Sequence, residues 1–281
     1  MSLLDRIRDC NSFDLSKFRP FKAGDRRIGW IRHAFAGRLA DFHKVFAIGK
    51  EDVALLPELE DYDARSAAIA EVVATLAEKG DIPTLRNELY GAAEGFAHEP
   101  LFAIDRAAVS YFGIGARGLH VNGYVRTDDG LKMWVGRRAE HRQMYPGMLD
   151  QMVAGGQPLG LTIAENLRKE AQEEASIPEE LIDKAVPVGA ITYCCEGEGG
   201  IKPDIQYCFD LEVSADFEPK NRDGEISEFE LWSIDRVAEV VASSQRFKFN
   251  CNLVIIDFLV RHGFLAPDDP DYVAIVRGLR Q

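Results

Sequence analysis

The segment Ala154–Leu181, AGGQPLGLTIAENLRKEAQEEASIPEEL, constrains the fold of this chain more than any other part of it. If residues 161–175 form a helix, Glu170, Glu173 and Glu174 stand at positions i, i+3 and i+4 and share one face. The opposite face is apolar and includes Ile163, Leu167, Ala171 and Ala175. The small alanines predict that this helix lies close against a sheet, with three carboxylates turned away from it.

Three neighbouring carboxylates are unfavourable unless their charge is neutralised. Each like-charge pair costs an isolated helix roughly 0.2–0.5 kcal/mol, and the C-terminal end of the helix dipole adds to the repulsion. A divalent cation removes this penalty, because Mg²⁺ prefers oxygen ligands and bridges them to substrate phosphates. The pattern E-x-x-E-E alone is also typical of a solvated acidic face. The preceding Gly-Gly turn and loop favour the metal site, since flexible backbone beside the carboxylates can approach a phosphate.

Strands and helices alternate along much of the chain, which predicts an α/β (α+β) fold with a mixed sheet. Two runs of alternating polarity, His120–Arg126 and Leu131–Arg138, flank the turn TDDG and predict a hairpin. Further strands are predicted at 27–31, 186–195, 205–213 and 229–232, and helices at 2–10, 64–79, 83–96, 234–242 and 252–262. A glycine-rich stretch at 113–118 separates a predicted N-terminal α+β domain, residues 1–115, from a second domain, residues 116–281.

Charge and cysteine content limit the classes of function. The net charge of −13 and the pI near 5.0 argue against a surface for nucleic acid or for an anionic membrane. Apolar runs stay well below the roughly 20 residues that a membrane helix needs. The five cysteines include no C-x-x-C pair, which is typical of a reduced, cytoplasmic protein. We therefore expect a small-molecule partner, and the sequence leaves open whether the protein is a monomer or a homodimer.

The segment from Gly155 to Ile177 resembles the Nudix box, G-x5-E-x7-R-E-U-x-E-E-x-G-U, in which U is apolar. Gly155 matches the opening glycine, Glu170 the first helix glutamate, and Glu173 and Glu174 the final pair. Three other positions depart from the box: Leu161 replaces its first glutamate, Lys169 its arginine and Ser176 its last glycine. In the family the first glutamate and the arginine brace the loop as a pair, so both partners of that brace are changed here. Glu165 and Arg168 are candidates for a substitute brace.

Flanking motifs resemble one branch of the family, related to the Nudix part of thiamine pyrophosphokinase fusion proteins. The motifs run in order from about residue 119 to 272: WVGRRA, YPGMLD, AGG, EAQEEASI, DGEISEF and IDFLVRHG. This resemblance implies a Nudix α/β/α sandwich preceded by a smaller domain of unassigned role. It also implies a Mg²⁺-dependent diphosphatase in which Mn²⁺ can replace Mg²⁺. The implied substrates are thiamine diphosphate and its oxidised or otherwise damaged analogues, cut to the monophosphate.

The resemblance assigns roles to individual residues. It implies that Glu170, Glu173 and Glu174 are metal ligands, with the Gly155 carbonyl as an additional one. Glu173 and Glu225 are the predicted catalytic residues, and Glu228 is the alternative to Glu225 as general base.

The remaining candidates concern the substrate. Arg137 and Arg138 are predicted to bind phosphate, but neighbours on a strand face opposite ways, so at most one should reach the site. Arg126 is a weaker candidate of the same kind. Tyr193, Tyr145 and Trp134 could stack on a flat heterocycle, although lone aromatic residues usually belong to the core. A hydrolase of nucleoside diphosphate derivatives and a non-catalytic metabolite sensor are the competing interpretations.

Overall fold

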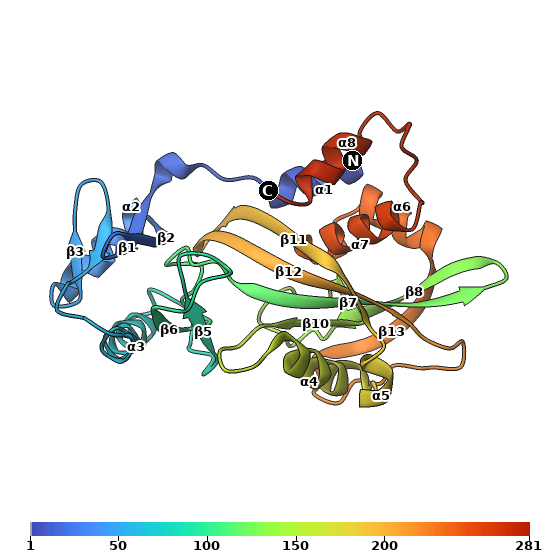
Figure 1. Cartoon of the computed structure of the whole chain (residues 1–281), viewed down its shortest axis with the longest axis horizontal. Coiled ribbons are helices and arrows are strands. Elements are labelled where there is room, and N and C mark those ends of the chain that lie inside the picture. Colours follow the sequence, from blue (N-terminus) through green and yellow to red (C-terminus); the bar gives the residue numbers. More distant parts are fainter. Residues whose placement is uncertain (1) are drawn as a thin grey trace.

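Residues 15–114 form a unit, on the left of Figure 1, whose own hydrophobic core extends from Phe21 to Ile114. In the computed structural model, which describes residues 2–281, this unit contains the sheet β2-β1-β4-β3 and the pair β5-β6. Its elements are η1 (Leu15–Lys17), β1 (Phe18–Ala23), β2 (Arg26–Arg32), α2 (His33–Leu39), η2 (Ala40–Phe42), β3 (Phe46–Ile48), β4 (Val53–Leu55), α3 (Tyr62–Glu78), β5 (Leu89–Ala92) and β6 (Phe102–Asp105). Phe21 and Phe112, with ring centroids 5.5 Å apart, lie in the centre of its core.

The predicted helix at 83–96 is wrong, because this stretch holds β5 between turns. Asn87 has a φ of 57°, in the left-handed region that ends an α-helix. The carboxylate of Asp105 accepts hydrogen bonds from the backbone N–H groups of Arg86 and Asn87. A residue that is distant in the sequence therefore satisfies the backbone groups that a helix would have paired, and local patterns cannot show this contact.

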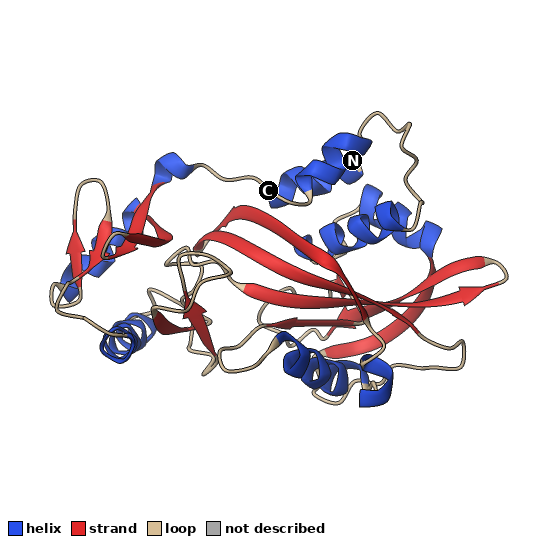
Figure 2. Cartoon of the chain, viewed as in Figure 1, coloured by secondary structure: helices blue, strands red, loops and turns tan. Residues whose placement is uncertain are grey.

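The second unit is built on a mixed seven-stranded sheet with helices on both faces (Figures 1 and 2). The path is β11-β12-β7-β8-β13, with β10 paired to β7 and β9 to β8; β12 and β7 are parallel. The strands are β7 (Arg117–Thr127), β8 (Gly130–Arg138), β9 (Leu149–Asp150), β10 (Val153–Gly156), β11 (Val186–Gly197), β12 (Gly200–Glu212) and β13 (Ile226–Ser233). The predicted hairpin and the later strands are thus confirmed, and the expected α/β/α sandwich is the observed architecture.

Two helical layers cover the sheet. One contains α4 (Ile163–Ala175) and α5 (Glu179–Ile182), and its core includes Leu167 and Ala171. The other contains α6 (Ile234–Ser243), α7 (Phe249–Arg261) and α8 (Tyr272–Gly278). Helix α1 (Leu3–Cys10) joins this second layer, packing its Leu4 and Ile7 into the same core as α7 and α8. Among residues 2–281, every helix is too short or too polar to cross a membrane.

Helix α4 is fixed at both ends by specific hydrogen bonds. Thr162 and Glu165 form a reciprocal capping box at its N-terminus. Ser176 ends it with φ 52° and ψ 34°, which explains why the Nudix box places glycine here. The serine tolerates this conformation with help from its side chain, whose hydroxyl donates to the Lys220 carbonyl and accepts from Arg222. The start of the acidic helix is therefore set by its own sequence, and its end is supported by residues 220 and 222.

Candidate active site

A cavity of about 630 Å³ lies between the N-terminal unit and the mixed sheet. Glu170, Glu173 and Glu174 of α4 line it from one side, and Tyr90 and Arg106 of the N-terminal unit line it from another. Its volume is within the range of cavities that enclose small molecules. The acidic face predicted from the sequence therefore faces this cavity.

Glu174 and Glu170 are the more buried of the three glutamates. Glu174 is 3% exposed and accepts a hydrogen bond of 2.7 Å from the Ala154 N–H. Burial, reinforced by the charge of Glu170, raises the pKa of Glu174 well above its ordinary value. Burial also raises the pKa of Glu170, while Lys169 opposes the shift. A Cβ on Gly155 would lie 2.7 Å from Glu170 Oε2, so only glycine lets the loop come this close to the carboxylate.

Three carboxylates of this wall, Glu170, Glu173 and Glu225, form ion pairs with basic side chains. The Lys169 ammonium lies 2.8 Å from Glu173 Oε2 and 3.1 Å from Glu170 Oε1, so the residue that replaces the family's arginine bridges two of the glutamates. Glu225 pairs with Arg142 and lies near enough to influence both Glu170 and Glu174 electrostatically. The structure thus brings Glu225 to the cavity from the loop before β13, as the sequence predicted.

The donors on this wall suit a hard divalent cation. They are carboxylate oxygens, two of them on groups whose pKa is raised by burial, and a cation would offset the penalty of burying that negative charge. Because Gly155 has no side chain, the backbone at this residue lies directly beside the Glu170 carboxylate. Glu170 and Glu174 therefore carry the donor chemistry for the metal that the Nudix box implies. Glu225 lines the same cavity, and Glu173 stands at the exposed edge of the group with a side chain 45% exposed.

A second group of residues has side chains that can bind metals, but its surroundings do not suit a cation. Within residues 2–281, the atoms of His120, Asp150 and Cys251 form the one set of three within 4.8 Å of one another. Asp150 already pairs with two cations, Arg138 at 3.0 Å and Lys248 at 3.3 Å, and accepts a hydrogen bond from the Cys251 thiol. A further cation would meet two positive charges, so this set is a buried ion-pair centre.

The two predicted phosphate-binding arginines face opposite ways, as alternation requires. Arg138 lines the cavity, although its guanidinium is tied to Asp150 and to the Met144 carbonyl. Arg137 lies on the other face of β8, paired with Glu228 and Glu230. The prediction of a phosphate-binding role for Arg137 therefore has no support from its position. Glu228, the alternative general base, lies with it, which leaves Glu225 at the cavity.

The aromatic candidates separate in the same way. Tyr193 lines the cavity, and its hydroxyl donates to Asp204 Oδ2 at 3.2 Å. Tyr145 also lines it, beside the ring of Phe249 at a centroid distance of 5.6 Å. Trp134 packs instead against the core under α4. Tyr193 and Tyr145 therefore remain the residues placed to meet a flat ring.

The loop before α4 is braced by residues that sequence reasoning missed. The Asn166 side chain donates to the Gly156 carbonyl at 2.8 Å, and the Gln157 side chain donates to the Leu161 carbonyl at 2.6 Å. The expected substitutes are wrong: Glu165 caps the helix, and Arg168 pairs with Asp183 and Glu179. Asn166 lies four residues before Glu170, on the same helix face, and this spacing was the signal that could have identified it.

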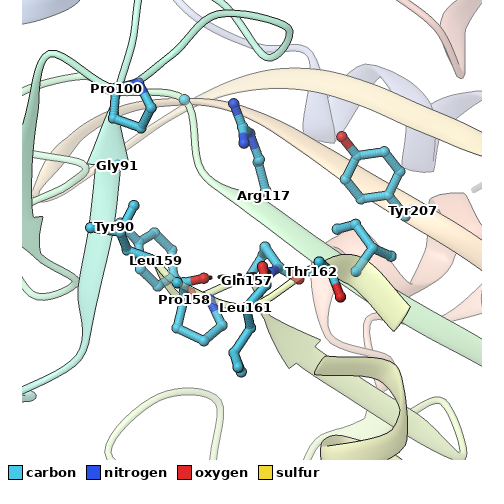
Figure 3. Close-up of a pocket in the computed structure, with 13 residues that line it drawn as sticks. Tyr90, Gly91, Pro100, Arg117, Gln157, Pro158, Leu159, Leu161, Thr162 and Tyr207 are labelled. Atoms are coloured by element: carbon cyan, nitrogen blue, oxygen red, sulfur yellow. Dashed lines mark hydrogen bonds between the residues drawn. The ribbon is translucent and has the colours of Figure 1, made fainter. Parts of the chain in front are cut away.

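The N-terminal unit supplies the rest of the brace. The Leu159 N–H donates to the Leu89 carbonyl of β5 at 2.7 Å. A smaller cavity of about 270 Å³ lies at this contact. Figure 3 shows Tyr90 and Gly91 of β5 next to the loop residues Pro158 and Leu159 in its wall. The loop of the Nudix box is thus held by two units of the chain, and no sequence motif pointed to the first of them.

Known proteins resemble this chain over most of its length. A family described as "Domain of unknown function (DUF4743)" matches residues 2–116. Nudix hydrolase 20 of Arabidopsis thaliana is 40% identical, over 98% of this chain and 77% of that protein, and Nudix hydrolase 24 is 40% identical over 99% and 77%; both names carry the word chloroplastic. The Nudix domain of Shewanella oneidensis NrtR, solved with ADP ribose, is 12% identical over 55% of this chain and 91% of that one, with a TM-score of 0.42. On its similarity to the two plant proteins, and with the metal-binding half of the Nudix box on its acidic helix, the chain belongs to the Nudix hydrolase family.

Proposed function

We propose that this protein is a Mg²⁺-dependent diphosphatase that cuts thiamine diphosphate, or its oxidised or otherwise damaged analogues, to the monophosphate and phosphate. As a Nudix hydrolase it acts on diphosphate-containing substrates. One observation carries the proposal furthest: the cavity has carboxylates on one wall and tyrosine rings on another, including Tyr193 and Tyr145. A substrate with an anionic diphosphate and a flat ring matches this arrangement. The identity of the ring rests on the resemblance to the thiamine-related branch.

The proposed reaction is attack of water on phosphorus, with cleavage of the P–O bond to the departing monophosphate. When bound, Mg²⁺ lowers the pKa of water and neutralises phosphoryl oxygens, and Mn²⁺ supplies the same chemistry. Glu170 and Glu174 would hold the cation. Glu225 accepts the proton of the attacking water, and its ion pair with Arg142 keeps the carboxylate oriented. Tyr193 and Tyr145 orient the ring, so that the diphosphate points toward α4.

We also propose that the protein is located in the cytoplasm. The chain has five free cysteines, three of them buried, which is compatible with the reducing cytoplasm that we propose. The word chloroplastic belongs to the names of the plant relatives.

A substrate panel tests the proposal. The protein is incubated with Mg²⁺ and thiamine diphosphate, its oxidised analogues and nucleoside diphosphate derivatives, and monophosphate release is measured. We expect the thiamine compounds to be cleaved fastest. Faster cleavage of a nucleotide compound would show that the substrate is a nucleoside diphosphate derivative. Absence of turnover across the panel would favour a metabolite sensor.

A pair of variants tests the metal wall. Glu174→Gln should reduce turnover by at least roughly 10²-fold, the scale of removing one electrostatic catalytic group. Glu179→Gln is the matched control, because this glutamate is exposed and pairs with Arg168 on the outer surface. Undiminished turnover in Glu174→Gln would overturn the metal assignment while leaving the activity in place.

A further inference from the structure

We propose that Arg106, a residue of the N-terminal unit, binds a phosphate oxygen of the substrate. The inference deepens the proposed function and rests on it. Arg106 lines the same cavity as Glu170, Glu174 and Glu225. Its position is close to the loop of the Nudix box, since Arg106 Cζ would lie 3.4 Å from a Cβ built on Gly156. The guanidinium therefore stands beside the place where the diphosphate must lie.

The charge balance of the cavity explains why a cation is needed at this point. A diphosphate that approaches Glu170, Glu174 and Glu225 is repelled by them, and a bound divalent cation offsets only part of that charge. Several other cations of the cavity wall are already committed: Lys169 to the glutamates of α4, Arg142 to Glu225, and Arg138 and Lys248 to Asp150.

Arg106 has an ion-pair partner outside the metal group, Glu88. Glu88 accepts from Arg106 Nη1 at 2.7 Å, and the Arg106 side chain is 48% exposed. A guanidinium has five N–H donors in a planar fork, so this bond occupies only part of its donor capacity. The fork matches two oxygens of a phosphate, which makes arginine better suited than lysine to this contact.

The turn that presents Arg106 is held firmly. Asp105, 8% exposed, accepts hydrogen bonds from the backbone N–H groups of Arg86, Asn87 and Ala107. The Arg106 N–H itself donates to the Glu88 carbonyl at 2.9 Å. The backbone on both sides of Arg106 is therefore fixed before any ligand binds, which reduces the entropy lost when the phosphate contact forms.

Two opposed variants test the inference by binding as well as by turnover. Affinity for methylene diphosphonate, a diphosphate analogue that water cannot cleave, is measured by calorimetry with and without Mg²⁺. Arg106→Gln should weaken binding by roughly 10- to 100-fold, the range for loss of a hydrogen bond to a charged group. Glu88→Gln should bind at least as tightly as the wild-type protein, because it removes the anion that competes for Arg106. Arg38→Gln, which removes an exposed arginine paired with Asp81 on the N-terminal unit, is the control for net charge.

The outcomes separate this inference from the proposed function. Equal weakening by Arg106→Gln and Glu88→Gln would show that their ion pair is only structural and would overturn the inference, as would unchanged binding in Arg106→Gln. Arg106→Lys should recover part of the affinity, since it keeps the charge and loses the fork. If the wild-type protein cleaves no diphosphate but binds the analogue through Arg106, the proposed activity fails while the binding site stands.

Discussion

Replacing Gly156 with alanine is expected to separate the N-terminal unit from the loop of the Nudix box. A Cβ built on Gly156 would overlap the hydroxyl oxygen of Tyr90, with Tyr90 Cζ next at 3.1 Å. Gly156 does not have one of the positive φ angles found among the described glycines, so alanine can adopt its backbone conformation. The expected effect therefore comes from the overlap with Tyr90 and not from backbone strain.

The size of the effect follows from which atom collides. Forcing an extra carbon into a packed contact costs roughly 1–3 kcal/mol, and we expect Gly156→Ala to lower the free energy of unfolding by that amount. Tyr90→Phe removes the overlapping oxygen and leaves ring carbons that need to shift by only a few tenths of an ångström. In the Tyr90→Phe background, Gly156→Ala should therefore cost at least about 1 kcal/mol less, a coupling expected only between residues in contact.

Urea unfolding followed by both fluorescence and circular dichroism measures this cycle, because two probes reveal whether the two units unfold together. Gly37→Ala is the control, since a Cβ on Gly37 in α2 meets nothing within 4 Å. Turnover is measured on the same four proteins and should follow the same pattern. If Gly156→Ala costs as much in the Tyr90→Phe background as in the wild-type protein, the contact between Tyr90 and the loop is not what the glycine serves, and the reasoning is refuted.

Three further predictions concern the rest of the site. Burial, with a smaller effect of Lys248, lowers the pKa of His120 from 6.5 to about 4. The neutral His120 side chain therefore contributes its full stability above pH 6.5, and about 3 kcal/mol of the free energy of unfolding is lost as the pH falls toward 4. His120→Gln should flatten this part of the pH profile of stability measured by urea unfolding. Asn166→Ala should reduce turnover and Glu165→Ala should leave it nearly unchanged, because only Asn166 holds the Gly156 carbonyl; equal effects would contradict that brace. Mg²⁺ or Mn²⁺ at about 100 times its Kd should stabilise the wild-type protein by about 2.7 kcal/mol in thermal unfolding, and chelation should reverse this; an equal gain in Glu174→Gln would exclude Glu174 as a ligand.

The acidic helix could be predicted because its information is local. The spacing of Glu170 and Glu174, the capping box at Thr162 and the glycines before the helix all lie within a short stretch of sequence. The hairpin of β7 and β8 was predictable for the same reason. The position of Glu225 in the same cavity was predicted from the family resemblance, because no local pattern in the sequence connects this residue to α4.

The other wall of the cavity could not be predicted, because it depends on contacts between distant segments. Tyr90 and Arg106 come from a part of the chain where no chemical motif is visible, and Asp105 shapes their turn through hydrogen bonds that no periodicity reveals. The failed helix at 83–96 has the same origin. The prediction of the loop's brace was wrong because it assumed a charged pair. The side-chain amide of Asn166 holds the loop instead, by donating to the Gly156 carbonyl.

The packing of α1 sets an order of events during synthesis. The Cys10 thiol donates to the Phe249 carbonyl, 239 residues away, and the Asn11 amide donates to the Gly278 carbonyl, 267 residues away. At roughly 5–20 residues per second, the ribosome takes at least about 12 s to make those partners after it has made α1. All residues that form the core of the N-terminal unit, from Phe21 to Ile114, are made long before then. Helix α1 is thus made well before the segments it packs against, and its apolar face stays exposed to water until they are made.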